Sequence, residues 1–146
     1  MGLIAMAGCG FVPAYGPSGV AGTWQNTVAV VTPDTPVGFA MRAHLERAFG
    51  PVRNQRYTLQ ITPRTAPVAA TITDGGDITR INLTGNAEWT LTDAGGTQID
   101  TGLVQTFTSY SATGSTVATQ SAEGAAQDRL AAALADLIVQ QILTSS

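Results

Sequence analysis

Apolar and polar residues follow two periods along the chain, and each period predicts a different kind of element. Residues 28–31 are all apolar and predict a short strand within residues 23–32. Pro36 suits the first turn of a helix, and either Asp34 or Thr35 can cap that helix. Apolar residues then recur at helical spacing, at Val37, Met41, Leu45, Ala48 and Phe49. We therefore expect an amphipathic helix after the first strand.

A second strand is predicted where apolar and polar residues begin to alternate. Tyr57, Leu59 and Ile61 are separated by threonine and glutamine, which is the pattern of a half-buried strand. Pro63 and Pro67 interrupt this pattern, and proline cannot donate a hydrogen bond to a neighbouring strand. We therefore expect the continuation of this strand to lie at an edge of the sheet, or to restart after a bulge.

The clearest alternation in the chain follows a glycine turn at residues 74–77. Its apolar side comprises Ile81, Leu83, Ala87, Trp89 and Leu91, and its polar side comprises Arg80, Asn82, Thr84, Glu88 and Thr90. A second glycine turn at residues 93–96 leads to a hairpin partner over residues 99–110. The period is less regular there, and Gly102 indicates a bulge.

The last part of the chain predicts a loop and then a long helix. Residues 113–121 are polar and contain glycine, which favours a frayed strand end or a loop. The helix is expected from about residue 122 to residue 143, with a buried stripe of Ala126, Leu130, Leu134, Leu137, Ile138 and Ile142. Its charged residues are too frequent for a membrane span of about 20 apolar residues.

The predicted element order is therefore β-α-β-β-β-α. Strands with one apolar face need cover on one side only, and two amphipathic helices supply it. We predict an α+β fold in which a mostly antiparallel four-stranded sheet carries two helices on one face, as a two-layer sandwich.

Composition and charge narrow the class of protein. The 146 residues suffice for one domain with a single core. A hydrophobic content of 44% with a net charge of -3 is typical of a folded chain and not of a disordered one. All seven cations are arginine and they form no basic stripe, so we expect no nucleic-acid partner.

The only cysteine, Cys9, lies at the end of a short apolar run, in the sequence MGLIAMAGCGF. This run resembles the lipobox of a bacterial lipoprotein signal peptide. Ala7 and Gly8 fit its two small positions, and Met6 replaces the usual leucine. We therefore expect Cys9 to carry a lipid, and two or three acyl chains on it would give stable membrane attachment.

This interpretation divides the chain into three parts. Residues 1–8 are expected to be the remnant of the signal peptide, because a complete one has about 15 to 30 residues. Glycine and proline are frequent in residues 9–22, which favours a flexible tether to the lipid anchor. Residues 23–146 are then the folded α+β domain.

The sequence offers little for catalysis. His44 is the only imidazole, and it lies in the first predicted helix without a nucleophile or metal-ligand motif at suitable spacing. Several aspartates fall in glycine turns, where aspartate commonly bonds to the backbone. Trp24 and Trp89 could stack on a ligand, but Trp89 is in phase with the apolar side of its strand, and Trp24 can cover the first strand. We expect no enzymatic activity, no metal and no cofactor.

Several segments together resemble one known family. They are the start Cys9-Gly10-Phe11-Val12-Pro13-Ala14-Tyr15-Gly16, residues 56–59, the hairpin of residues 87–96, residues 109–111 and the terminal helix from residue 127 to residue 142. These segments cover most of the chain from Cys9 onward and are similar to the alphaproteobacterial branch of the LptE lipoproteins. Gly124 departs from the acidic stretch expected there and weakens the start of the helix.

The resemblance implies a periplasm-facing, lipid-anchored protein of the outer membrane. Members of the family sit inside the LptD β-barrel, and help it to assemble and to deliver lipopolysaccharide to the cell surface. An auxiliary lipoprotein of a periplasmic lipid-transport ABC system can share such a sheet-and-helix plan, and it is the alternative.

The resemblance also implies contact with lipopolysaccharide. Four arginines that flank the predicted sheet are candidates for its phosphates, because guanidinium groups form paired hydrogen bonds with phosphate oxygens: Arg53, Arg56, Arg64 and Arg80. The polar side of the clearest strand is the candidate surface for the barrel, because its apolar side must face the helices. The partner-facing candidates are Asn82, Thr84, Glu88 and Thr90.

Overall fold

The computed structural model describes residues 20–72, 74–75 and 78–145, so Cys9 and the predicted signal remnant lie outside the described residues. In chain order the elements are α1 (Val20–Trp24), β1 (Val28–Val31), α2 (Pro36–Phe49), β2 (Tyr57–Ile72), β3 (Ile78–Asp93), β4 (Gln98–Ser111) and α3 (Thr116–Thr144). None of the helices among these residues is both long enough and apolar enough to cross a membrane.

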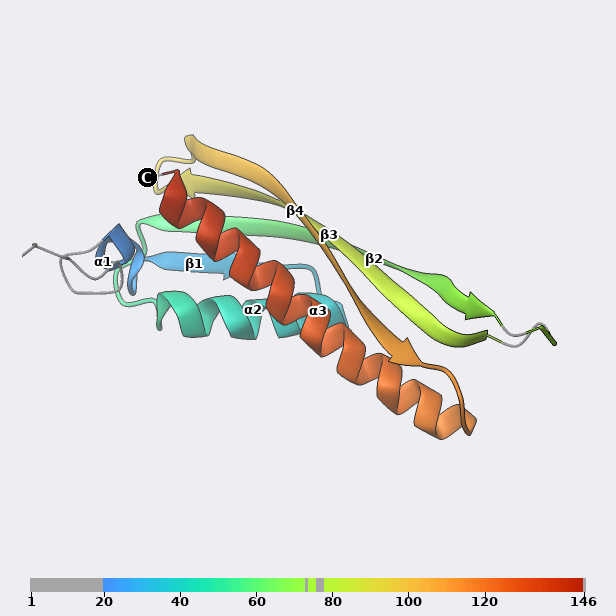
Figure 1. The fold of residues 1–146 in the computed structure, drawn as a ribbon. Coiled ribbons are helices and arrows are strands. Elements are labelled where there is room, and N and C mark those ends of the chain that lie inside the picture. Colours follow the sequence, from blue (N-terminus) through green and yellow to red (C-terminus); the bar gives the residue numbers. More distant parts are fainter. Residues whose placement is uncertain (1–19, 73, 76–77, 146) are drawn as a thin grey trace, which may run out of the picture.

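The sheet has the strand order β1-β2-β3-β4. β1 runs parallel to β2, and the other two pairs are antiparallel. α2 and α3 lie on one side of the sheet, which we call the inner face, and no helix of the described residues lies on the outer face (Figure 1). The predicted two-layer α+β sandwich is confirmed. The sheet is mixed because α2 carries the chain back across the sheet between β1 and β2, as a parallel pair requires.

The first two helices differ in how well local sequence predicts them. α2 starts as expected, because Thr35 caps it and its hydroxyl accepts a hydrogen bond from Gly38 N at 3.1 Å. α1 was not predicted, and it begins at Val20, in the segment expected to be a tether. Five residues are too few to show a helical period, and such a short helix depends on tertiary contacts. Trp24 at its end is buried in the core.

The third helix is longer than predicted. It begins at Thr116, so the expected loop over residues 113–121 is correct only as far as Ser115. Ser115 caps the helix, and its hydroxyl accepts a hydrogen bond from Ala118 N at 3.2 Å. Such a cap contributes about 1 kcal/mol, which offsets a cost of similar size, about 1 kcal/mol, for Gly124 within the helix. The first three residues of α3 are exposed, so no apolar stripe marks its start.

Both prolines lie inside β2, which continues through them without a break. β1 pairs only with residues 57–60, so the rest of β2 is an edge strand, as predicted. Tyr57 N donates to Thr27 O, beside β1, so the backbone groups of odd-numbered residues of β2 point toward this edge. Pro63 and Pro67 are both odd-numbered. Neither proline therefore removes a hydrogen bond between β2 and β3.

Gly102 does not mark a bulge, although the sequence suggested one. It pairs directly with Trp89, and the irregularity of β4 instead leaves Ile99 as the extra residue. A Cβ on Gly102 would lie 2.7 Å from Trp89 Nε1 and 2.8 Å from Gln141 Oε1. The glycine therefore makes room for the hydrogen bond that Trp89 Nε1 donates to Gln141 Oε1 at 2.9 Å. This bond ties α3 to the sheet.

The core lies between the inner face of the sheet and the two long helices. Its buried residues include most of the predicted stripes: Val37, Met41, Leu45, Phe49, Leu83, Ala87, Trp89, Leu91, Ala126, Leu130, Leu134, Ile138 and Ile142. Ala48 is exposed instead, and Ile81 and Leu137 are only half-buried. The far end of the β2–β3 hairpin extends past the helices (Figure 1), and residues 64–70 are exposed at every position.

Candidate interaction surface

The four residues predicted to face a partner lie in one row along the outer face of β3. Their neighbours in sequence, such as Leu83 and Trp89, are buried on the inner face beneath the helices. Thr84 and Glu88 are exposed, whereas Asn82 and Thr90 are half-buried. The row is therefore accessible from the helix-free side of the sheet.

Three of the four side chains already form contacts within the sheet. Thr84 Oγ1 donates to Ala66 O at 2.9 Å, Ser109 Oγ donates to Asn82 Oδ1 at 2.7 Å, and Thr90 Oγ1 lies 3.4 Å from Thr101 Oγ1. A partner would exchange these bonds for others, at a net gain of about 1 kcal/mol each. Glu88 contributes the only charge in the row.

Two apolar side chains of β4 interrupt the polar character of the outer face. Leu103 is 48% exposed and Phe107 is 65% exposed. They pair with Glu88 and Thr84 respectively, so they share the face of the polar row. Sequence reasoning missed them because β4 carries large apolar residues on both faces, which hides the period of two. Counting in steps of two within β4 would have separated Leu103 and Phe107 from buried Val104.

A shallow hollow of about 460 Å³ lies at the centre of the outer face. Its lining combines the guanidinium group of Arg64, the amides of Asn86 and Gln105 and the ring of Phe107. Gly85 lies between them, and on the inner face a Cβ at this position would come within 2.8 Å of a Leu130 methyl group. One cation, two amides and an aromatic ring suit non-covalent docking of a polar chain or an amphiphile.

The structure does not bring the four candidate arginines together. Arg53 and Arg56 lie in the segment before β2, where their backbone N–H groups donate to Asn26 and Thr27. Arg64 lies eight residues further along an extended chain, about 26 Å from Arg56. Arg80 lies at the far end of β3, past the hollow. These residues therefore line the length of the sheet and do not form one phosphate site.

The other residues with potential chemistry have structural surroundings. His44 is half-buried on α2, with its Nδ1 3.4 Å from Arg47 Nη1. In the described ranges no group of three His, Cys, Asp or Glu side chains could hold a metal ion. Trp24 packs on Tyr57 with ring centroids 4.8 Å apart, and Trp89 bonds to α3. Each tryptophan therefore has its own partner in the core.

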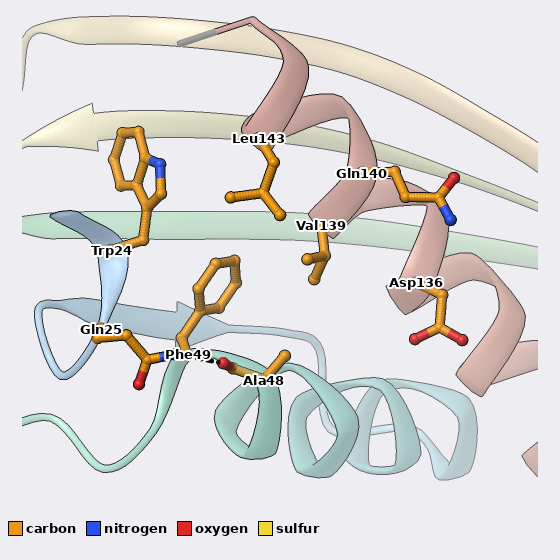
Figure 2. Close-up of a pocket in the computed structure, with 8 residues that line it drawn as sticks. All are labelled: Trp24, Gln25, Ala48, Phe49, Asp136, Val139, Gln140 and Leu143. Atoms are coloured by element: carbon orange, nitrogen blue, oxygen red, sulfur yellow. Dashed lines mark hydrogen bonds between the residues drawn. The ribbon is translucent and has the colours of Figure 1, made fainter. Parts of the chain in front are cut away.

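A pocket of about 230 Å³ lies on the helix side of the molecule, among α1, α2 and α3 (Figure 2). Trp24, Phe49, Val139 and Leu143 form its apolar walls, and Asp136 is the one titratable group in its lining. The indole Nε1 of Trp24 is buried and has no hydrogen-bond partner in the part of the chain that the structure describes. The pocket can hold an apolar group, but its lining contains no acid–base pair.

Comparisons with known proteins agree with this fold. The family described as LptE, lipopolysaccharide-assembly, matches residues 25–142. No curated protein matches the chain. A lipoprotein from Caulobacter crescentus CB15 is 21% identical with a TM-score of 0.72, over 88% of this chain and 96% of that one.

Two further solved structures share the fold at lower identity. Rare lipoprotein B from Shewanella oneidensis is 10% identical with a TM-score of 0.62, over 82% of this chain and 93% of its own. A minor lipoprotein from Acinetobacter baumannii is 19% identical with a TM-score of 0.57, over 82% of this chain and 90% of its own. At these identities the likeness is evidence for the fold alone.

Proposed function

Because the chain belongs to the lipopolysaccharide-assembly family LptE, we propose that it is an outer-membrane lipoprotein that partners the LptD β-barrel. In this role it helps the barrel to assemble and to deliver lipopolysaccharide to the cell surface, without catalysing a reaction. The family match over residues 25–142 carries the proposal. The helix-free outer face of the sheet supports it, because it offers a broad surface for docking.

The test of this proposal is co-purification from membranes. The full-length protein, tagged at its C-terminus and fused to a complete secretion signal, is expected to co-purify with the LptD barrel from detergent-solubilised outer membranes. Capture of an inner-membrane ABC complex instead would favour an auxiliary lipid-transport lipoprotein. Recovery of neither complex would contradict the partner assignment.

We further propose that Cys9 carries the lipid anchor. The motivating observation is the sequence Ala7-Gly8-Cys9 after an apolar run. Cys9→Ala should abolish labelling by radioactive palmitate and release the protein into the soluble periplasmic fraction. Labelling that persists in this variant would reject the assignment.

We propose that the outer face of the sheet contacts the barrel. A photo-crosslinking residue at Thr84, Thr90 or Phe107 should trap the barrel, whereas one at Leu83 should mainly destabilise the fold. Phe39 on α2 is the matched control, because it is 53% exposed on the helix side and Phe107 is 65% exposed on the outer face. Crosslinks from Phe39 and none from Phe107 would reverse the proposed orientation.

The candidate arginines can be tested in the two groups that the structure separates. Arg53 and Arg56 precede β2, and Arg64 and Arg80 lie on the sheet. If guanidinium groups hold lipid A phosphates, changing one pair to glutamine should weaken binding of lipid A by the purified protein, because glutamine carries no charge. Unchanged binding in both paired variants would remove these residues from the site.

A further inference from the structure

β4 is the last strand of the sheet, so one of its edges has no neighbouring strand among the residues that the structure describes. Ala112 N donates to Thr79 O at 3.1 Å, which fixes the even-numbered residues as those that bond to β3. In an antiparallel pair the intervening residues direct their N–H and C=O groups away from the partner. The odd-numbered residues 101–109 therefore present their backbone groups along the free edge.

Both ends of this row are blocked. Thr101 N donates to Asp100 Oδ1 at 2.8 Å. Two side chains of α3 reach carbonyl groups of the row: Gln141 Nε2 donates to Leu103 O at 3.4 Å, and Arg129 Nη2 donates to Ser109 O at 3.2 Å. Between them, no hydrogen bond from another described residue reaches the outward backbone groups of Gln105 and Phe107. We call these groups the open edge.

Apolar side chains flank the open edge on both faces of the sheet. Leu103 and Phe107 are exposed on the outer face. On the inner side α3 runs beside β4 (Figure 1), and Ala133 and Leu137 follow Arg129 at four-residue spacing, which places them along the same side of the helix. Both are half-buried. An added strand would therefore bury apolar contacts as well as pair its backbone.

The opposite edge of the sheet has the protection that β4 lacks. Proteins commonly block edge strands with proline and charge, and β2 carries Pro63, Arg64 and Pro67 along its free edge. Residues 101–111 of β4 contain neither proline nor a charged residue. An uncharged edge without proline is a template for pairing with an uncharged chain.

We propose that the open edge binds an extended, uncharged segment of a partner polypeptide, which adds to the sheet as a fifth strand beside β4. Main-chain hydrogen bonds supply the affinity in this mode, and pockets for alternate side chains supply the specificity. The stretch between Leu103 and Ser109 spans about 20 Å and accommodates about six residues of an extended chain. Pairing along this edge alone is short for a stable dimer, whose interface buries roughly 1,200 Å², whereas the proposed barrel partner would also contact the outer face of the sheet.

The partner tested is the LptD barrel, so this inference rests on the proposed function. Wall strands of a closed barrel have their backbone groups paired, so the added strand should come from a loop or a luminal segment. Backbone amide exchange is compared between the free full-length protein and its complex with the barrel. Exchange at Gln105 and Phe107 should slow at least tenfold in the complex.

Gln105→Pro tests the edge directly. Proline removes an outward N–H without touching a bond to β3, as Pro63 and Pro67 show in β2. Gln105→Thr is the matched control, because it also removes the side-chain amide that lines the hollow but keeps the backbone N–H. Gln105→Pro should bind the barrel about tenfold more weakly than Gln105→Thr does. If Gln105→Pro fails to fold, the exchange measurement on the wild type decides alone.

The outcomes separate the two proposals. A complex that forms while Gln105 and Phe107 exchange freely would overturn strand addition and leave the proposed function intact. Failure of the wild type to form a complex would overturn both. Protection that appears in the free protein and grows with its concentration would identify the occupant as a second copy, which would overturn the assignment to a partner.

Discussion

The two ends of the β2–β3 hairpin have the same strand pairing and opposite surroundings. At the end near α1, which we call the covered end, four side chains are at most 2% exposed: Leu59, Ile61, Trp89 and Leu91. At the far end, which we call the projecting end, residues 64–70 of β2 are exposed at every position, on both faces of the sheet. Pairing with β3 continues through both ends. Side chains of this sheet are therefore buried by the helices that pack on it and not by strand pairing.

α3 covers the inner face of β3 and β4 and leaves the far part of β2 uncovered, since Leu83 and Tyr110 are buried whereas residues 64–70 are exposed. It crosses the inner face close to Gly85, where a Cβ would lie 2.8 Å from Leu130 Cδ2. Its first three residues, from Thr116, are themselves exposed. At the projecting end β3 still pairs with β4, and the part without helix cover is β2 at the edge of the sheet. The projecting end is therefore expected to contribute little to the free energy of unfolding, and substitutions can measure the difference.

The largest effect is expected from Leu134→Ala at the covered end. Leu134 has no exposed surface and packs against the inner face beside Gly85. Removing a buried leucine side chain leaves a cavity and should lower the free energy of unfolding by about 3 kcal/mol. Denaturant unfolding measures this, with half-buried Leu137→Ala as the milder control. A loss below about 1 kcal/mol would show that α3 packs loosely on the sheet.

Gly85→Ala should have the next largest effect, about 1–3 kcal/mol, because an added methyl group overpacks the core. Its Cβ would lie 2.8 Å from Leu130 Cδ2 and 3.1 Å from Leu134 Cδ1. Gly124→Ala on exposed α3 is the control, since nothing lies within 4 Å of its Cβ. This control should stabilise the helix by up to about 1 kcal/mol. Equal effects of the two variants would contradict the close packing of α3 against Gly85.

The sequence predicts the covered end well because local period and burial agree there. The apolar stripes of α2 and β3 and the cap at Thr35 all lie where helices meet the sheet. The family resemblance, which rests in part on the hairpin of residues 87–96 and the terminal helix, is confirmed by the match over residues 25–142. Periodicity indicates on which face of the sheet a side chain lies. This is enough to predict burial where helices cover one of the two faces.

The projecting end is predicted poorly because periodicity does not report how far a helix reaches. The alternation that continues through Ile81 predicts a buried face, yet Ile81 is only half-buried and its partner Ala69 on β2 is exposed. The polar row on β3 is placed correctly on the outer face. Its apolar neighbours Leu103 and Phe107 were missed, because β4 has large apolar residues on both faces and only a count in steps of two separates them from Val104.

The caps of α2 and α3 allow the two ends to be compared by the same change, which is loss of a capping hydroxyl group. Thr35 caps α2 at the covered end, and Ser115 caps α3 at the projecting end. Thr35→Ala should lower the global free energy of unfolding by about 1 kcal/mol. Ser115→Ala should mainly speed amide exchange in the first turns of α3, because those turns can open locally while the core stays folded. Equal global losses would show that the start of α3 folds cooperatively with the core.

The smallest effect is expected from Val68→Thr at the projecting end. This change keeps the shape and the β-branch of the side chain, and Val68 is 51% exposed, so the new hydroxyl group can bond to water. The free energy of unfolding should change by less than about 0.5 kcal/mol.

Val104→Thr is the same substitution at the covered end, where Val104 is 4% exposed. Its hydroxyl group would lose water without gaining a partner, at a cost of about 1–3 kcal/mol. Val68 pairs with Asn82 on the outer face and Val104 pairs with Ala87 on the inner face, so the two losses compare an open face with a helix-covered face under the same chemical change. A loss at Val68 as large as that at Val104 would mean that the projecting end is covered in solution. Repeating the measurement at several protein concentrations would then reveal whether another copy supplies that cover.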